Sequence, residues 1–311
     1  MTPLGDHYNA EFIYNLNAKG MALHLTIFKV QEIMKSSNGR VYVRRGAQNL
    51  PLEDEAALER LRFDKGLKSF EGTILNDVDK NEISNSITVL EFLMENMDSI
   101  EPSAWLLKQR VMLGDRPTVA GVLLYSDLPQ TILPKRSSVK ILRYQTKGQG
   151  ERDSMMNDPV TIEGPIYNLV YDAVDKCKEI VEKIERLGLN GLEKVVYPEE
   201  ALHEIVTNAV LHRDYSIATD VQIRIFDNRI EIESPGKLPG HVTVKNISTT
   251  QFSRNPQIVR LINKFKNPPN KDVGEGWNTA AEAMGKLRLK EPVLWRIQVA
   301  SARLCCSECT S

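Results

Sequence analysis

The chain has 311 residues, of which 41% are hydrophobic and 26% are charged, and its formal net charge is −1. This length predicts two or three domains with a sizeable core, and the near-zero charge excludes a strong overall field that would attract nucleic acid or a membrane surface. The four cysteines do not form a disulfide framework, and the sequence shows neither a signal peptide nor an apolar run that could span a bilayer. We therefore expect a cytoplasmic protein without a membrane partner.

Two β-rich runs near the N-terminus flank a turn signal. The runs are MALHLTIFKVQEI, residues 21–33, and GRVYVRRGAQNLP, residues 39–51. The Asn-Gly pair between them predicts that they form one hairpin, whereas the first twenty residues show no clear pattern. Arg44 and Arg45 on the second run have two readings, as phosphate contacts to DNA or as ordinary surface arginines on a strand edge.

Helix and strand signals then alternate up to a polar segment. Helices are predicted over residues 52–70, over residues 84–98 and directly after Pro102. Buried strands are predicted over PTVAGVLLYS, residues 117–126, and VKILRYQT, residues 139–146. Turn-forming residues dominate KGQGERDSMMNDP, residues 147–159, where we expect a domain boundary.

Two amphipathic helices follow this segment. The first covers residues 164–188 with apolar residues at i, i+3 and i+4 spacing, and Gly188 is expected to end it. The second begins near Pro198, and its apolar stripe runs through HEIVTNAVLHRDYS, residues 203–216. Glu204 and Asn208 are four residues apart, so they share a face at the flank of that stripe.

A pair of antiparallel strands is predicted next, joined by Asp227-Asn228. In DVQIRIF and RIEIESPG, isoleucines alternate with polar residues, which is typical of a half-buried pair. A loop, a polar segment resembling a lid, the short helix IVRLINKF, a second glycine-containing loop and the helix WNTAAEAMGKLRL complete the pattern.

These pieces contain the groups that an ATP site requires. The amide oxygen of Asn208 suits Mg²⁺, and Glu204 can orient or deprotonate an attacking water. Glu233, at a strand end, can accept a hydrogen bond from an exocyclic amine, and Gly274 and Gly276 can expose backbone N–H groups to phosphate. The alternative is a solvated helix face and an ordinary turn, and the order of the motifs favours the ATP site.

The motifs resemble those of a known group of ATPases. HEIVTNAVLHRDYS looks like the N-box of the GHKL ATPases, and ESPGKLP and GEGWNTAAEAM look like their two glycine boxes. More narrowly, NAVLHRDYS, DNRIEIESPGKLP, SRNPQIVRLI and GEGWNTAAEAM resemble the ATP-binding half of prokaryotic RecG-like or "divergent AAA" transcriptional regulators. VYVRRGAQNLP resembles the last strand of the Schlafen-type, Alba-like DNA-binding domain of that family, and AGVLLYSDLPQTILP resembles its middle segment.

The resemblance implies a role for each matching residue. It makes Glu204 the catalytic base and Asn208 the Mg²⁺ ligand. It places further residues around ATP: His212, Arg213 and Asp214 near the phosphates, Glu233 and Gly236 beside the adenine, Ser253, Arg254 and Asn255 in a lid, and Gly274 and Gly276 on the phosphates.

The resulting prediction is an α+β protein in three parts. Residues 1–52 are expected to form a partial Alba-like DNA-binding module, residues 53–150 a middle helix–strand region, and residues 151–311 a GHKL-like (Bergerat) ATPase α/β sandwich. After Pro292 the strand alternation is lost, so we expect a truncated or frame-shifted end, a missing edge strand, and an unstructured tail containing Cys305, Cys306 and Cys309.

The predicted function is an ATP-binding and ATP-hydrolysing regulator that acts on DNA with ATP and Mg²⁺, as a homodimer. The alternative is a non-enzymatic interaction protein, or a pseudo-ATPase with a degenerate pocket. Hydrolysis distinguishes the two, because only an active ATPase needs Glu204.

Overall fold

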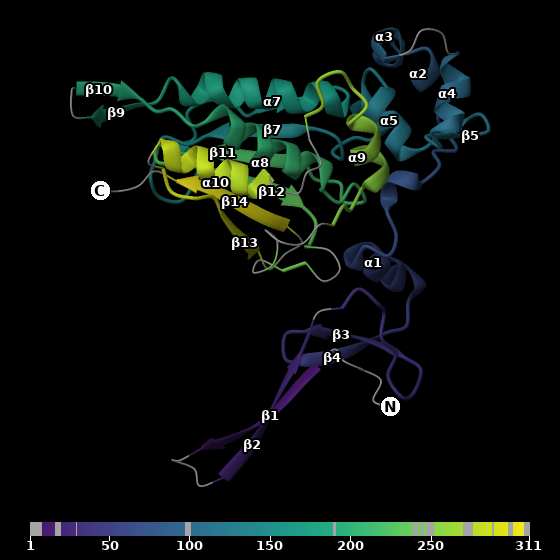
Figure 1. The fold of residues 1–311 in the computed structure, drawn as a ribbon, viewed down its shortest axis with the longest axis vertical. Coiled ribbons are helices and arrows are strands. Elements are labelled where there is room, and N and C mark those ends of the chain that lie inside the picture. The colour runs from purple at the N-terminus through teal and green to yellow at the C-terminus, as the bar shows by residue number, and fades with distance from the viewer. Residues whose placement is uncertain are drawn as a thin grey trace. The chain divides into compact units, whose positions relative to one another are not determined.

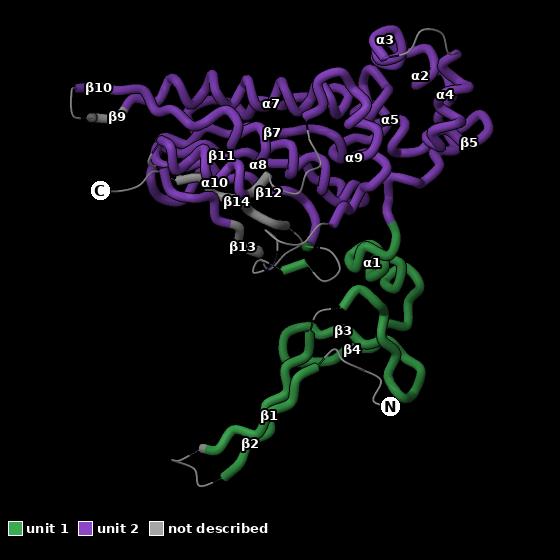
Figure 2. The backbone as a smooth tube through the Cα atoms, in the orientation of Figure 1, with its two compact units in different colours: residues 1–68, 238–243 green, residues 69–237, 244–311 purple. Residues whose placement is uncertain are grey.

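The computed structural model of the chain divides into two compact units (Figure 2). Unit 1 comprises residues 1–68 and 238–243, and unit 2 comprises residues 69–237 and 244–311. The structure describes residues 8–15, 20–28, 30–96, 101–188, 191–238, 242–243, 246, 252–269, 276–287, 289–297 and 301–307.

Unit 1 contains two hairpins and a helix. Strands β1 (Tyr8–Asn15) and β2 (Gly20–Ile27) pair antiparallel, as do β3 (Val41–Arg45) and β4 (Gln48–Leu52). Helix α1 (Glu55–Lys65) lies within the range predicted for it. The Asp54 side chain accepts from two backbone N–H groups of its first turn, and Gly66 ends it in the left-handed conformation at φ 72°.

The predicted hairpin between residues 21–33 and 39–51 is wrong. The segment around Gly39 does turn, since Ser36 N donates to Arg40 O at 2.9 Å and Gly39 has φ 78°. However, β2 ends at Ile27 and pairs with β1, and β3 pairs with β4. A local turn signal fixes a chain reversal, but it does not decide which strands become partners.

Unit 2 begins with short elements. They are η1 (Phe70–Gly72), α2 (Asn81–Ser84), α3 (Ile87–Asn96), α4 (Pro102–Lys108), β5 (Met112–Leu113), β6 (Arg116–Pro117), α5 (Val119–Tyr125) and α6 (Pro129–Ile132). The helices predicted over residues 84–98 and after Pro102 are confirmed as α3 and α4.

The strand predicted over residues 117–126 is instead helix α5. Every residue of α5 is buried, so its sequence has no polar face that would reveal a helical period. Thr118 caps the helix by accepting from Gly121 N at 3.2 Å. A Cβ on Gly121 would lie 2.3 Å from Val111 O, so this glycine permits close packing of α5 against the chain before it.

Six described strands of unit 2 form one sheet in the order β13-β14-β12-β11-β7-β8, whereas β5 pairs with β6 separately. Its strands are β7 (Val139–Arg143), β8 (Val160–Ile162), β11 (Val221–Ile225), β12 (Arg229–Pro235), β13 (Val293–Ile297) and β14 (Ser301–Ser307). Strand β7 runs parallel to β11, and the other neighbours are antiparallel. The strands predicted at residues 139–146 and 220–235 are confirmed.

The sheet corrects two expectations about the chain's organisation. Residues 147–159, which contain η2 (Arg152–Ser154), connect the paired strands β7 and β8, so the break expected there lies inside unit 2. Strand β14 lies between β13 and β12 and includes Cys305 and Cys306, so the predicted unstructured tail and missing strand are wrong at these positions. Cys309 lies outside the described residues.

Helices α7 (Ile166–Val181), α8 (Glu199–Leu211) and α10 (Gly276–Lys286) form the helical layer of unit 2 (Figure 1). Helix α8 packs against α7, α10 and β12, and the isoleucines of β11 and β12 join the same core. Helix α7 ends before Gly188, which lies in the hairpin of β9 (Glu185–Gly188) and β10 (Gly191–Lys194). Helix α9 (Pro256–Ile262) confirms the short helix predicted there. No helix in the described ranges is long and apolar enough to cross a bilayer.

Candidate nucleotide site

Helix α8 presents the two residues that the sequence singled out first. The apolar stripe of α8 is buried, whereas Glu204 and Asn208 at its flank are half-buried. Asn208 Nδ2 donates to Glu204 Oε1 at 2.6 Å. The four-residue spacing therefore brings the carboxylate and the amide into direct contact.

The amide oxygen of Asn208 suits a hard cation that takes most of its ligands from elsewhere. With Nδ2 donating to Glu204, the amide oxygen of Asn208 points away from the carboxylate. Across the described ranges, no group of three His, Cys, Asp or Glu side chains could enclose a metal ion. The amide oxygen of Asn208 is a single protein ligand, which fits Mg²⁺ held largely by water and phosphate oxygens rather than by an all-protein cage.

A buried hydroxyl on α8 was not identified from the sequence. Thr207 is 1% exposed, and its Oγ1 has no hydrogen-bond partner in the described part of the chain. Such an atom is costly to bury, so it marks a place where water or a ligand group would be stabilising. No residue pattern reveals it, because threonine in an apolar stripe usually bonds back to its own helix.

The side of α8 towards α7 carries aromatic contacts. The His203 ring lies 5.3 Å from the Tyr171 ring, and burial lowers the pKa of His203 although Glu204 and Glu199 oppose this. Tyr171 also donates its hydroxyl to Asn267 O at 2.8 Å. Tyr171 and Asn267 also line an open hollow together with Tyr167, Asn168 and Asp172. Glu204 and Asn208 do not line this hollow.

The HRDYS turn after α8 is built from buried polar groups. His212 caps the helix, its N–H donating to Asn208 O at 3.1 Å. Arg213 is 1% exposed, donates to Thr219 O and lies 5.0 Å from the Tyr215 ring centre. Burial lowers the pKa of Arg213, and nearby acidic and phenolic groups partly offset this.

Asp214 joins this turn to the end of β12. Asp214 N donates to Pro235 O at 2.8 Å, and its carboxylate accepts from Ser216 N at 3.0 Å. Gly236 has φ 119°, and a Cβ there would lie 2.7 Å from Asp214 Cβ. The glycine is therefore required by the close approach of Asp214, which occupies the space that a side chain at residue 236 would need.

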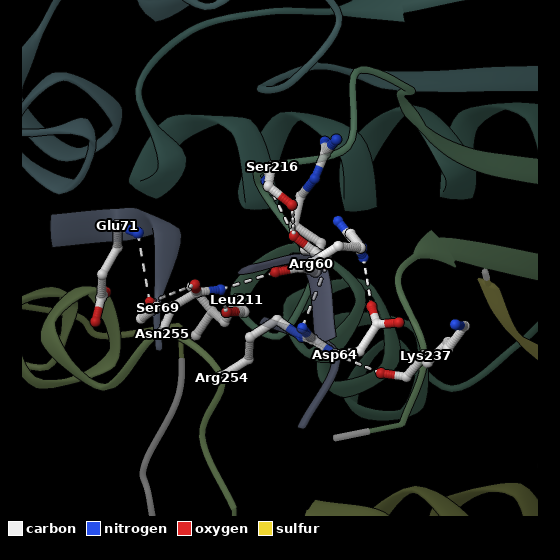
Figure 3. A network of polar contacts seen from close by, with 11 residues as sticks. Arg60, Asp64, Ser69, Glu71, Leu211, Ser216, Lys237, Arg254 and Asn255 are labelled. Carbon is white, nitrogen blue, oxygen red and sulfur yellow. Dashed lines mark hydrogen bonds and ion pairs between the residues drawn. The ribbon is translucent and has the colours of Figure 1, made fainter. Parts of the chain in front are cut away.

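Arg254 and Asn255 complete the network (Figure 3). Arg254 forms a buried ion pair with Asp214 at 3.4 Å and donates to Lys237 O. Asn255 Nδ2 donates to Leu211 O at 2.8 Å and to Arg213 O at 2.9 Å, which satisfies carbonyls at the end of α8.

The same network reaches η1 and α9. Ser69 Oγ lies 3.4 Å from Asn255 Oδ1, and the Glu71 carboxylate accepts from Gln257 N at 2.9 Å and Ile258 N at 2.8 Å. Glu71 therefore caps the first turn of α9 from another part of the chain. The sequence contains no signal for this cap, because Glu71 and Gln257 are far apart along the chain.

Six of the predicted site residues fall into two groups. Arg213, Asp214, Arg254 and Asn255 are at most 6% exposed and bind one another or backbone carbonyls. This gives them a structural role at the end of α8. Glu204 and Asn208 are more exposed and retain the chemistry of a ligand site.

Glu233 does not lie on the same side of the sheet as Glu204 and Asn208. Ile230 and Ile232 face the helices, so residue 233 faces the opposite side of the sheet, where Glu233 pairs with Arg224 at 2.8 Å. The inward residue at this strand end is Ser234, whose hydroxyl donates to Ala209 O of α8 at 2.7 Å. The alternation of isoleucine and glutamate in β12 predicts that Glu233 lies on the side of the sheet opposite the helices.

The remaining predicted residues lie at separate places along the chain. Ser253 is half-buried, and its Oγ has no hydrogen-bond partner within the described ranges. Gly276 begins α10, which packs against α8. Gly274 lies outside the described residues. Arg44 donates to Gly46 O and Asn49 Oδ1 at the turn of its own hairpin, and Arg45 is exposed.

Comparisons with known proteins concern the domain that contains α8 rather than its individual residues. Residues 218–301 match the family model described as "Putative ATP-dependent DNA helicase recG C-terminal", a range that begins after α8. No curated protein matches the chain.

The fold is similar to the crystal structure of the DIP2311 protein from Corynebacterium diphtheriae, with a TM-score of 0.59 and 15% identity. The similarity covers 97% of this chain and 50% of that chain, so this chain spans about half its length. At this identity the likeness concerns the fold alone. The family match supports the presence of an ATPase-like domain of the RecG C-terminal kind in unit 2.

Proposed function

We propose that unit 2 binds ATP with Mg²⁺ and hydrolyses it at α8. The observation that carries the proposal is the contact between Glu204 and Asn208, one helical turn apart at the flank of the buried apolar stripe of α8. The match of residues 218–301 to an ATPase-like domain supports ATP as the ligand.

Each residue of the pair has a distinct role. The Asn208 amide oxygen contributes a ligand to Mg²⁺, and the bond from Nδ2 to Glu204 holds the amide in that orientation. The Glu204 carboxylate orients and deprotonates the attacking water. Mg²⁺, when bound, neutralises charge on the phosphates. Asn255 stabilises the end of the helix that carries both residues, because its Nδ2 donates to Leu211 O and Arg213 O.

Two measurements on three forms of the full chain test the proposal: calorimetry measures Mg²⁺-ATP binding, and a phosphate-release assay measures hydrolysis. We expect wild type to bind, Asn208→Ala to lose the Mg²⁺-dependent part of the affinity, and Glu204→Gln to bind but release no phosphate. Glu204→Gln is a conservative change, because its side-chain oxygen can still accept the bond from Asn208 while the basic carboxylate is gone.

Glu182→Ala is a matched control, since Glu182 is an exposed glutamate at the end of the neighbouring helix α7. It should bind and hydrolyse ATP as wild type does. If wild type and Glu204→Gln release phosphate at the same background rate, this site does not hydrolyse ATP. Binding without turnover in wild type would favour the pseudo-ATPase, and absence of binding would favour the interaction protein.

DNA binding and transcriptional regulation have less support than ATP binding. They depend on the resemblance of VYVRRGAQNLP to a Schlafen-type, Alba-like domain and on two arginines. The Arg44 side chain donates hydrogen bonds within its own hairpin, to Gly46 O and Asn49 Oδ1. Arg45 lies on the opposite face of the strand, so the two arginines do not form one basic patch. ATP binding is therefore the function that we put forward.

A further inference from the structure

The β1–β2 hairpin of unit 1 has one wholly apolar face. The register pairs Tyr8 with Ile27, Ala10 with Leu25, Phe12 with Leu23 and Tyr14 with Met21. Because alternate residues point to opposite sides, these eight residues share one side of the hairpin, which we name the apolar face. The other side carries Asn9, Glu11, Ile13, Ala22, His24 and Thr26, and on it His24 Nδ1 contacts Glu11 Oε1 at 2.7 Å.

Seven of the eight residues of the apolar face are exposed, and Tyr8 is half-buried. The exposed fractions are 70% for Phe12, 61% for Tyr14, 66% for Met21, 60% for Leu23, 47% for Leu25 and 59% for Ile27. Scattered exposed apolar residues are common on proteins, but a continuous apolar surface marks an interaction site. An isolated two-stranded hairpin is also marginal in water unless something covers its apolar side.

The size of the face matches what one partner contributes to a stable interface. Aromatic side chains bury about 150–250 Å² each, and with the aliphatic ones taken near the lower end of that range, the six side chains at these exposures leave roughly 700 Å² open. A standard protein interface buries about 800 Å² on each partner. Two copies of this face would together bury an area within the usual range for a specific dimer.

We propose that two copies of this chain associate through their apolar faces. The face carries no charged residue, so it is complementary to itself and buries no unpaired charge when two copies meet about a twofold axis. The Glu11–His24 pair then remains in water on the outer side of each hairpin. The contact involves unit 1 only and does not depend on nucleotide.

Sedimentation equilibrium of the full chain from about 1 to 100 µM measures this association directly. We expect wild type to be a dimer, and Leu23→Glu to weaken dimerisation at least about tenfold by placing a charge in the centre of the face. Ala22→Glu is the matched control: it adds the same charge to an exposed neighbouring residue on the opposite side, and it should remain dimeric.

Phe12→Lys, on the other strand, tests the face with the opposite charge and should dissociate the dimer as well. Circular dichroism checks that each variant is folded. A wild type that stays monomeric at the highest concentration would overturn the proposal. So would equal effects of Leu23→Glu and Ala22→Glu, or a monomer that binds neutral phosphatidylcholine vesicles through this face, which would identify lipid as its partner.

Discussion

Replacing Gly236 by alanine tests whether the glycine after β12 is required by its contact with Asp214. Gly236 has φ 119°, and an added Cβ would lie 2.7 Å from Asp214 Cβ and 3.3 Å from Asp214 N. The strain of positive φ costs about 1–2 kcal/mol. Relieving the overlap must shift Asp214, which donates to Pro235 O and pairs with Arg254, and overpacking of this kind costs about 1–3 kcal/mol more. We expect the free energy of unfolding to fall by about 2–5 kcal/mol.

Urea unfolding of the full chain, followed by tryptophan fluorescence, measures this loss. Gly164→Ala separates the two contributions, because Gly164 has φ 129° but no atom within 4 Å of an added Cβ. That control should show the backbone strain alone. If both alanines lower the stability equally, within about 0.5 kcal/mol, the overlap with Asp214 contributes nothing and the reasoning is refuted.

Three further predictions concern unit 2. Asn255→Ala should cost about 2–4 kcal/mol in urea unfolding, because it leaves two buried carbonyls at the end of α8 without their donor; Asn255→Asp, which has no donor, should not restore the loss. Burial raises the pKa of Glu71 although its hydrogen bonds to α9 lower it, so the folded state holds that proton more tightly than the unfolded state. Wild type should therefore lose stability relative to Glu71→Gln as pH rises through the pKa of Glu71, and a pH-independent difference between the two would contradict this assignment. Burial raises the pKa of Cys177 to about 12, so mass spectrometry after maleimide treatment at pH 8 should find the Cys177 peptide unmodified until the chain is unfolded.

Short-range patterns predicted several elements of unit 2 correctly. The apolar stripe of α8 and the acids at its first turn locate this helix, and the four-residue spacing places Glu204 beside Asn208. The alternation in β11 and β12 likewise identifies a half-buried antiparallel pair. In both cases the residues that specify the structure are neighbours in sequence, so the local pattern contains the necessary information.

The alternation of residues in β12 places Glu233 correctly, whereas the apolar pattern of α5 is ambiguous. Glu233 alternates with inward isoleucines, so its position on the outer face of the sheet was available from the sequence, although its partner Arg224 was not. In α5 the ambiguity is physical, since a fully buried apolar segment has no polar side from which to tell a helix from a strand.

The sequence by itself determined those local elements whose pattern is unambiguous, such as α8, β11 and β12, and the contact between Glu204 and Asn208, because these depend on residues within one or two helical turns. Only the tertiary structure decided that β2 pairs with β1, that β14 lies inside the sheet, and that Asp214, Gly236 and Asn255 form one buried network. Those arrangements depend on backbone groups and side chains far apart in the chain, and their partners are chosen when the core is packed and every buried polar group must find a bond.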